Sequence, residues 1–230
     1  KRHGALNLLS YRDEGFLPDA LLNYLVRLGW SNGDQEIFSI EEMIKLFELK
    51  NINNSPASFN QEKLEWMNQN YIKTTSLYNL IGHLSFHLEK LNINLDNGPE
   101  INQLIEFLRE RSKSLADLAQ SCIMFYKDFE AFDEAQANKT FKAGSIEVLQ
   151  DLVSQLSRVN DWNSNNIHSV IELICEERNI GFGKVGQPFR LALSGDGKAG
   201  SIDKSAQFVG KERTLSRLEM AIDWINSQHN

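Results

Sequence analysis

The chain has 230 residues and a mass of 26.3 kDa, which is enough for one large domain or two or three small ones. Its apolar fraction of 41% and charged fraction of 24% are typical of a soluble globular protein and exclude a disordered or collagen-like one. No stretch approaches the length of a membrane-spanning apolar run, and the first residues lack the apolar core of a signal peptide. The net charge of −7 disfavours a protein that coats nucleic acid indiscriminately, but leaves open a partner that meets one face.

The cysteines and the charge distribution narrow the class further. Cys122 and Cys175 lie among apolar neighbours without a CxxC pair or a Cys/His array, so we expect neither structural zinc nor a disulfide framework. This usage favours a reducing, cytoplasmic compartment. From Lys184 onward the chain has seven basic and five acidic residues, whereas the part before it has 17 and 26. The mildly basic end is a weak indication of a polyanionic partner, and a chance imbalance explains it equally well.

Almost every segment repeats its apolar residues at every third or fourth position, which predicts an all-α protein. Pro18 suits a first helical turn, and the helix that it opens is expected to stop at Gly29. Ser39 and Glu42 have the spacing of a capping box, and residues 60–68 are typical of another helix start. Further helices are predicted over residues 77–91, 100–111, 114–129, 145–156, 163–178 and 214–225.

Three breaks suggest boundaries, at residues 73–76, 92–99 and 181–190. Residues 181–200 contain six of the fourteen glycines, a density that lets the backbone approach a ligand or another chain closely. An interhelical linker explains them equally well. Gly181, Gly183 and Gly186 have the spacing of GxGxxG, but no strand precedes them and Pro188 is expected to block the helix that should follow. A dinucleotide site is therefore rejected.

Other candidate chemistry is weak. His83 and His87 have the spacing of two metal ligands on a helix, but no third ligand is evident, and core or surface histidines are more common. Cys122 is expected to pack rather than to react. Helical cores are also expected to hold Trp66, Trp162 and Trp224. The residues alone therefore show no catalytic constellation and indicate a helical binding module.

Several segments resemble a known family. Residues 11–30 (YRDEGFLPDALLNYLVRLGW) and 33–39 (GDQEIFS) closely resemble the sequence after the catalytic loop of bacterial glutamyl-tRNA synthetases. Residues 1–5 (KRHGA) resemble the end of that KMSKS-type loop, K-x-S-K-R, and the residues just after the loop. Residues 183–195 (GKVGQPFRLALSG) are similar to the family's G-K-x-x-x-P-L-R-x-A-x-T-G, and residues 210–213 (GKER) to its usual finish. The resemblance covers essentially the whole chain in family order.

The resemblance implies the C-terminal half of a class I aminoacyl-tRNA synthetase. A helical stem-contact region at residues 1–75 would be followed by a two-part α-helical anticodon-binding domain at residues 76–160 and 161–230. The parent enzyme attaches glutamate to tRNA(Glu) with ATP and Mg²⁺. Without the catalytic domain, this chain is expected to be an inactive, cytoplasmic monomer that binds tRNA but no metal or cofactor. Lys1 and Arg2 would be a remnant of the ATP loop.

The resemblance also assigns the tRNA-binding residues. Arg111 matches the arginine that reads the first anticodon base and favours C over U, and Arg190 matches the arginine of P-L-R at the anticodon's far end. Arginine suits this task, because its planar fork of donors binds a base edge or stacks on it. The middle-base positions are occupied by Ala199, Gly200 and Ile202. Ala199 lacks the hydroxyl that Ser or Thr would offer, which leaves backbone groups and Ile202 to read that base.

Two alternatives remain. One is a free-standing helical protein–protein interaction module without RNA binding, which salt-dependent binding to tRNA would separate from the synthetase interpretation. The other is a complete enzyme with hidden catalysis, which the lack of a nucleotide-binding motif disfavours. The sequence does not distinguish a parent that charges only glutamate tRNA from one that also charges glutamine tRNA.

Overall fold

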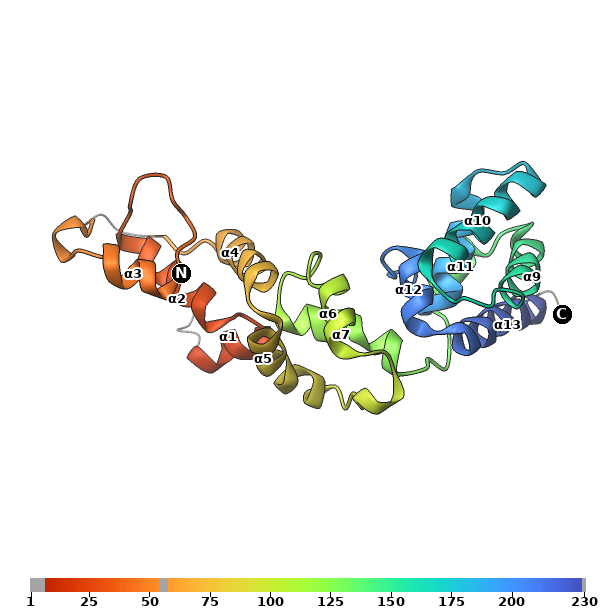
Figure 1. Ribbon diagram of the computed structural model, residues 1–230, viewed down its shortest axis with the longest axis horizontal. Coiled ribbons are helices and arrows are strands. Elements are labelled where there is room, and N and C mark those ends of the chain that lie inside the picture. Colours follow the sequence, from red (N-terminus) through yellow and green to blue (C-terminus); the bar gives the residue numbers. More distant parts are fainter. Residues whose placement is uncertain (1–6, 54–57, 229–230) are drawn as a thin grey trace. The chain divides into compact units, whose positions relative to one another are not determined.

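The computed structural model describes residues 7–53 and 58–228, which form 13 α-helices and two short 3₁₀-helices and contain no strand (Figure 1). Extended pairing in these ranges consists of two isolated bridges, Trp30 with Ile52 and Asn32 with Gln35. The prediction of an all-α fold is confirmed. No helix in the described ranges combines the length and apolar character needed to cross a membrane.

The chain divides into two compact units. Unit 1 comprises residues 1–94 and 100–123, and unit 2 comprises residues 95–99 and 124–230. The first unit contains α1 (Leu8–Glu14), α2 (Pro18–Gly29), α3 (Ile40–Leu46), η1 (Leu49–Asn51), α4 (Gln61–Thr74), α5 (Leu77–Lys90), α6 (Ile101–Leu108) and most of α7 (Leu115–Tyr126). The second contains η2 (Leu95–Asn97), α8 (Glu134–Thr140), α9 (Ser145–Leu156), α10 (Ser164–Arg178), α11 (Phe182–Ser194), α12 (Ile202–Val209) and α13 (Lys211–Ser227).

The three-part division expected from the resemblance stays a prediction. Its first limit, between residues 75 and 76, falls between α4 and α5, and its second, between residues 160 and 161, falls between α9 and α10. Each limit therefore coincides with a turn between two helices of the same unit.

Local signals fixed several helix ends as predicted. The Ser39 hydroxyl accepts a hydrogen bond from the Glu42 N–H at 3.1 Å, and the Glu42 carboxylate accepts one from the Ser39 N–H at 2.7 Å. This capping box starts α3, and Pro18 occupies the first turn of α2. Gly29 is the last residue of α2 rather than the residue after it, since the chain turns to extended backbone at Trp30.

The expectation that Pro188 blocks a helix was wrong, and so was the proposed break at residues 181–190. Helix α11 runs from Phe182 to Ser194 with Pro188 inside it. A proline within a helix costs about 3 kcal/mol. Val185, Phe189 and Leu193 recur at helical spacing with at most 1% of their surface exposed, and each contributes about 1.5–3 kcal/mol when buried. The burial outweighs the proline. The sequence patterns also missed α1, α8 and α12.

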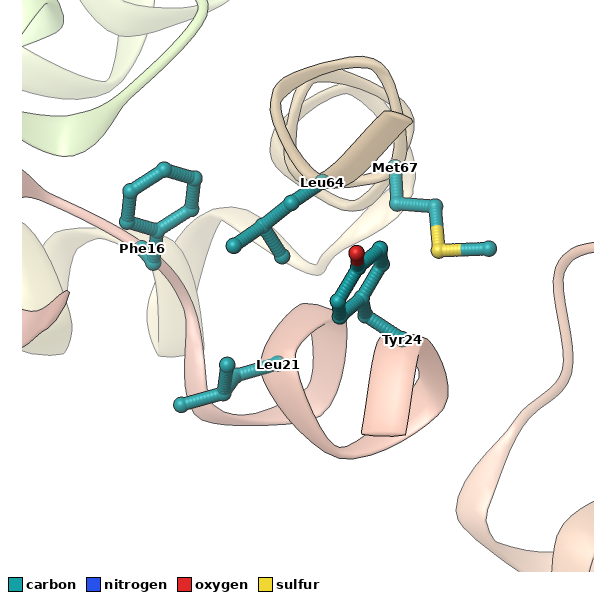
Figure 2. Packing of buried hydrophobic residues seen from close by; sticks show 5 residues of the cluster. All are labelled: Phe16, Leu21, Tyr24, Leu64 and Met67. Carbon is teal, nitrogen blue, oxygen red and sulfur yellow. The ribbon is translucent and has the colours of Figure 1, made fainter. Parts of the chain in front are cut away.

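One core cluster of unit 1 forms where α2 and Phe16, two residues before it, meet α4. Phe16, Leu21 and Tyr24 pack against Leu64 and Met67, and Figure 2 shows these side chains between the two helices. The Tyr24 hydroxyl, at the polar end of a buried ring, accepts a hydrogen bond from a backbone N–H at 2.6 Å. This packing fixes α4, which carries the polar side chains described below.

Trp66 was expected in this core but is 44% exposed. The buried positions of α4 are Leu64, Met67, Asn68, Tyr71 and Ile72, which recur at the helical period. Residue 66 lies outside that stripe, because it stands two positions after one core residue and one before the next.

The core of unit 2 lies between α9, α10, α11, α12 and α13, and α9 packs closely against α13. Leu149, Leu152 and Leu218 are at most 1% exposed within it. The Lys211 ammonium at the start of α13 donates to the backbone oxygens of Ser157 at 2.7 Å and Val159 at 2.8 Å, just after α9. The lysine of the GKER segment therefore serves the structure, because positive charge is favourable where helix carbonyls end.

Candidate nucleic-acid interface

Arg109 and Arg111 lie on the turn after α6 and differ completely in their surroundings. The Arg109 side chain is buried, and its guanidinium donates to the backbone oxygens of Ile72 at 3.1 Å, Thr75 at 2.7 Å and Lys73. These oxygens lie at the end of α4, where helix carbonyls lack intrahelical partners. Arg109 thus joins α6 to α4 and is not available to a ligand.

Arg111 is exposed, and its side chain makes no hydrogen bond or ion pair with any residue that the structure describes. Its backbone N–H donates to the Leu108 oxygen at 3.2 Å, so the main chain is held while the guanidinium remains free. The group is therefore available to a molecule outside the chain. Its role as a reader of the first anticodon base stays a prediction.

A buried asparagine, which the sequence analysis did not single out, supports this turn. Asn68 has no exposed surface, and its side-chain oxygen accepts from the Leu17 N–H at 2.8 Å. Its amide donates to the backbone oxygens of Gly15 at 3.2 Å and Lys113 at 2.7 Å. One side chain of α4 thus fixes two loops, including the one just after Arg111. A polar residue on the apolar face of a predicted helix was the signal that could have identified it.

Gly15 is required by this arrangement. Its φ is +89°, and a Cβ atom there would lie 2.4 Å from the Ala116 nitrogen and 2.7 Å from the Leu115 nitrogen. The Leu115 N–H donates to the Gly15 oxygen at 2.8 Å. The Gly15 turn therefore contacts the start of α7 directly, and only glycine allows that approach.

Arg111 borders a shallow cleft of about 430 Å³ in unit 1. The lining side chains are of mixed charge and polarity: Glu14, Phe16, Gln61, Glu65, Arg111, Lys113, Ser114 and Asp117. Three carboxylates make the cleft unsuitable for a phosphate-rich surface. Exposed base edges carry both donors and acceptors, so a mixed lining is compatible with a single unstacked base.

Arg190 lies on α11 and is half-buried. Its Nε is buried and has no hydrogen-bond partner in the described part of the chain, and no ion pair of its guanidinium occurs there. Buried donors are normally satisfied, so an unpaired one calls for an explanation. That nitrogen has no accessible surface, so a bound molecule would pair with the other two nitrogens of this half-buried guanidinium.

Of the residues predicted at the middle base, Ala199 and Gly200 lie in the turn between α11 and α12, and Ile202 is the first residue of α12. Ala199 is 7% exposed and Ile202 is 4% exposed, while Gly200 is half-buried. The Ile202 Cδ1 lies 3.1 Å from the position that a Cβ on Gly186 would take, so this side chain packs onto α11. Gly186 precedes Arg190 by one helical turn, which brings the 199–202 turn near Arg190. In this structure the Ile202 side chain is therefore packed inside unit 2 and is not exposed to a ligand.

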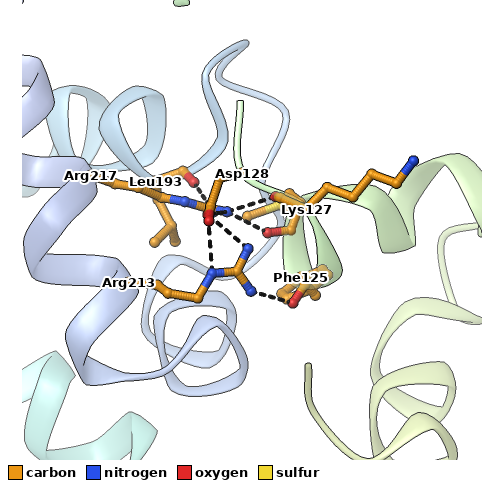
Figure 3. A network of polar contacts seen from close by, with 7 residues as sticks. Phe125, Lys127, Asp128, Leu193, Arg213 and Arg217 are labelled. Atoms are coloured by element: carbon orange, nitrogen blue, oxygen red, sulfur yellow. Dashed lines mark hydrogen bonds and ion pairs between the residues drawn. The ribbon is translucent and has the colours of Figure 1, made fainter. Parts of the chain in front are cut away.

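An arginine pair holds the end of α11 in place (Figure 3). The Arg217 side chain is 5% exposed and donates to the backbone oxygens of Leu193 at 2.7 Å and Met124 at 2.9 Å. Arg217 and Arg213 both bond one oxygen of Asp128, at 2.9 and 2.8 Å. Burial would raise the pKa of the Asp128 carboxyl, but the hydrogen bonds from both arginines outweigh it and lower that pKa. The helix that carries Arg190 is thus anchored one turn beyond that residue.

The remaining candidates for chemistry do not form a site. His83 is exposed whereas His87 is 4% exposed, and burial lowers the pKa of His87, so the pair does not face a common ligand. Cys122 is fully buried, which raises its pKa to about 12 and agrees with a packing role. No group of three His, Cys, Asp or Glu side chains arranged for a metal ion occurs within residues 7–53 and 58–228. Lys1 and Arg2 lie outside the described residues.

Comparison with known proteins places this geometry in a family. The family model described as "Anticodon binding domain" matches residues 64–222, and the one described as "tRNA synthetases class I (E and Q), catalytic domain" matches residues 1–66. Glutamate–tRNA ligases from Ruthia magnifica and Vesicomyosocius okutanii are both 54% identical to the chain over 97% of its length. In each case the chain spans 49% of the relative.

Similar solved structures come from the same family of ligases. A glutamate tRNA ligase from Elizabethkingia meningosepticum, determined in complex with its amino acid, has a TM-score of 0.82 and 31% identity, covering 93% of this chain and 42% of the ligase. Glutamate-tRNA synthetase from Elizabethkingia anophelis has a TM-score of 0.77 with the same identity and coverage. The chain therefore belongs to the anticodon binding domain family of class I aminoacyl-tRNA synthetases, in which its relatives are glutamate–tRNA ligases.

Proposed function

We propose that this chain recognises the anticodon of a glutamate tRNA. The observation that carries the proposal is which arginine side chains already have partners within the chain. The guanidinium groups of Arg109, Arg213 and Arg217 donate to backbone oxygens and carboxylates of the chain itself. Arg111 and Arg190 are the residues that match the family's anticodon contacts, and neither guanidinium has a partner among the described residues. Free guanidinium groups on anchored backbone suit a base edge.

The family of the relatives supports a wider proposal. A complete ligase of this kind would attach glutamate to tRNA with ATP and Mg²⁺, and this chain would contribute tRNA binding. The described residues do not fit a nucleotide: the glycine-rich segment opens helix α11 instead of following a strand. We assign no catalytic step to them. We further propose that the chain acts as a monomer in the cytoplasm.

The proposal is tested by titrating the chain with two tRNAs that differ only in C or U at the first anticodon position. If Arg111 bonds the cytosine edge, Arg111→Gln removes a charge-assisted contact worth about 1–3 kcal/mol, a loss of roughly five- to 150-fold for the C-containing tRNA. The loss for the U-containing tRNA is expected to be smaller. Arg190→Ala is expected to weaken both.

Arg158 provides a matched control. It is exposed and its side chain also lacks a partner in the described part of the chain, but it matches no anticodon contact. Arg158→Gln is expected to leave both affinities nearly unchanged. Equal losses for C and U in Arg111→Gln would show that Arg111 contacts only the RNA backbone or nothing. Absence of any salt-dependent tRNA binding by the wild-type chain would instead favour the protein–protein interaction module.

A further inference from the structure

A large cleft of unit 2 does not include the predicted anticodon residues in its lining, and the proposed function gives it no role. It has a volume of about 1050 Å³. Its lining comes from α8, the turn before α9, the end of α10 and the start of α11, and we name it the α8–α11 cleft. Its polar and glycine lining comprises Lys139, Thr140, Lys142, Gly144, Ser145, Glu177, Arg178, Gly181, Gly183, Lys184 and Gln187.

The cleft is basic although the chain as a whole is acidic. Four cations and one carboxylate line it, in a chain with a net charge of −7. Arg178 is neutralised by an ion pair with Asp151 outside the cleft. Lys139 and Lys184 are exposed and have no ion pair with any described residue, and the Lys142 ammonium donates only to the Asn138 backbone oxygen, at 2.8 Å. With Arg178 paired, the three lysines and Glu177 leave the lining with a net charge of +2.

One glycine of the cleft, Gly183, has no internal reason to be glycine. It stands in the first turn of α11, and a Cβ atom there would meet no atom within 4 Å. Glycine in a helix costs about 0.5–1 kcal/mol relative to alanine, so this residue lowers stability without relieving a clash. The other two glycines have local reasons, since Gly181 is the N-cap of α11 and Gly144 has a φ of +85°. Close approach of an external group to the backbone accounts for Gly183.

The backbone at this place is polarised to receive an anion. No side chain caps the N-terminus of α11, and no acidic residue stands in its first turn. The N-terminus of α9 also lacks a side-chain cap and begins after Gly144 in the left-handed conformation, but it has Glu147 in its first turn, so the anion-binding end is that of α11. The amides and the positive dipole end of α11 therefore add to the lysine charge. The lysine charge, Gly183 and the α11 N-terminus together point to one class of ligand, a phosphate group.

We propose that the α8–α11 cleft binds a backbone phosphate of the same RNA whose anticodon Arg190 contacts, an inference that rests on the function proposed above. Gly183, Gln187 and Arg190 follow the i, i+4, i+7 pattern and share one face of α11. Seven residues of helix span about 10 Å, a distance that a few nucleotides of a single strand bridge. The cleft positions the strand, and Arg190 contacts the base.

The first test compares single lysine variants of the chain in titrations with a labelled anticodon stem–loop at several salt concentrations. Lys139→Ala and Lys184→Ala are each expected to weaken binding roughly fivefold to tenfold and to lower the salt slope by about 0.7 for each lost phosphate contact. Lys204→Ala is the matched control, because Lys204 is an exposed lysine of the same unit that does not line the cleft. Equal effects of Lys184→Ala and Lys204→Ala would overturn the proposal and leave anticodon recognition standing.

A second variant separates ligand approach from folding. Gly183→Ala is expected to retain or raise the melting temperature while weakening binding of the stem–loop. Gly82→Ala on α5 is its control, since a Cβ there also meets no atom within 4 Å. It is expected to change stability similarly and binding not at all. If Gly183→Ala binds the stem–loop as tightly as the wild type, no phosphate approaches that backbone.

The source of the phosphate is identified with modified RNA and with inorganic phosphate. Replacing single phosphates of the stem–loop by neutral methylphosphonates should reveal one position that weakens wild-type binding but no longer matters in Lys184→Ala. Inorganic phosphate should shift the amide resonances of Gly181 and Gly183 only weakly. Saturable shifts with inorganic phosphate but no sensitive RNA position would assign the cleft to a free anion and overturn the RNA proposal. A stem–loop that does not bind the wild type at all would instead refute the proposed function.

Discussion

Replacing Asn68 by alanine is expected to destabilise unit 1 by about 2.5–7 kcal/mol. The side chain satisfies the buried Leu17 N–H and Gly15 oxygen and the partly buried Lys113 oxygen. Each of the two buried groups costs about 1–3 kcal/mol when left unpaired, whereas water reaches the third group and its loss costs only about 0.5–1 kcal/mol. The sum is a large part of the roughly 5–15 kcal/mol that stabilises a typical domain.

The assay is urea unfolding in a background with Trp162→Phe and Trp224→Phe, so that fluorescence reports Trp30 and Trp66 of unit 1. Asn70→Ala is the control two positions along the same helix. The Asn70 side chain donates only to the Trp66 oxygen within its own helix, at 2.8 Å, so its loss should change the free energy of unfolding by at most about 0.5 kcal/mol. A loss in Asn68→Ala no larger than that of the control would refute the reasoning.

Asn68→Asp tests the hydrogen-bond directions. The carboxylate still accepts from the Leu17 N–H, but it faces the oxygens of Gly15 and Lys113 without a donor. Burial and these oxygens should raise the pKa of the new carboxyl in the folded state. The variant should therefore be most stable below the unfolded-state pKa of about 3.9 and lose stability as the pH rises through the folded-state value. A pH-independent loss would contradict this assignment.

Three further predictions concern other buried groups. Because burial raises the Cys122 pKa to about 12 whereas Cys175 is only half-buried, a thiol reagent near pH 8 should modify Cys175 in the native chain and Cys122 only after unfolding. Arg217→Met should destabilise unit 2 by about 3–5 kcal/mol in urea unfolding, because it removes the donor of the Leu193, Met124 and Lys127 backbone oxygens, whereas Asp128 keeps its ion pair with Arg213; Arg158→Met should not. Burial raises the Tyr71 pKa to about 12. The neutral phenol therefore stabilises the fold below pH 10, near the unfolded-state pKa of about 10, and this stability is lost as the pH rises toward 12. Tyr71→Phe should flatten this pH dependence in urea unfolding.

Apolar periodicity and capping residues along the chain were enough to locate many helices. Residues 145–156 were predicted as a helix and form α9 with the same bounds. Helix starts depend on neighbours at most three residues away, as at the Ser39 capping box, Pro18 and the Asn60 cap. Their effect can therefore be predicted from the sequence. Family motifs likewise singled out Arg111 and Arg190 because each motif is contiguous. Such features need no knowledge of distant contacts.

The sequence by itself therefore determined the helical class, most helix positions and the candidate arginines. It did not determine which polar side chains form hydrogen bonds inside the fold and are therefore unavailable to a ligand. Arg109 and Arg111 are two residues apart on the same turn, and only the position of the α4 carbonyls decides that Arg109 is buried while Arg111 remains free. Helix α11 tolerates Pro188 because distant helices bury its apolar residues, and the same packing places Ile202 against Gly186. A side chain's availability depends on partners remote in the chain, and those partners are brought into reach only by the tertiary fold.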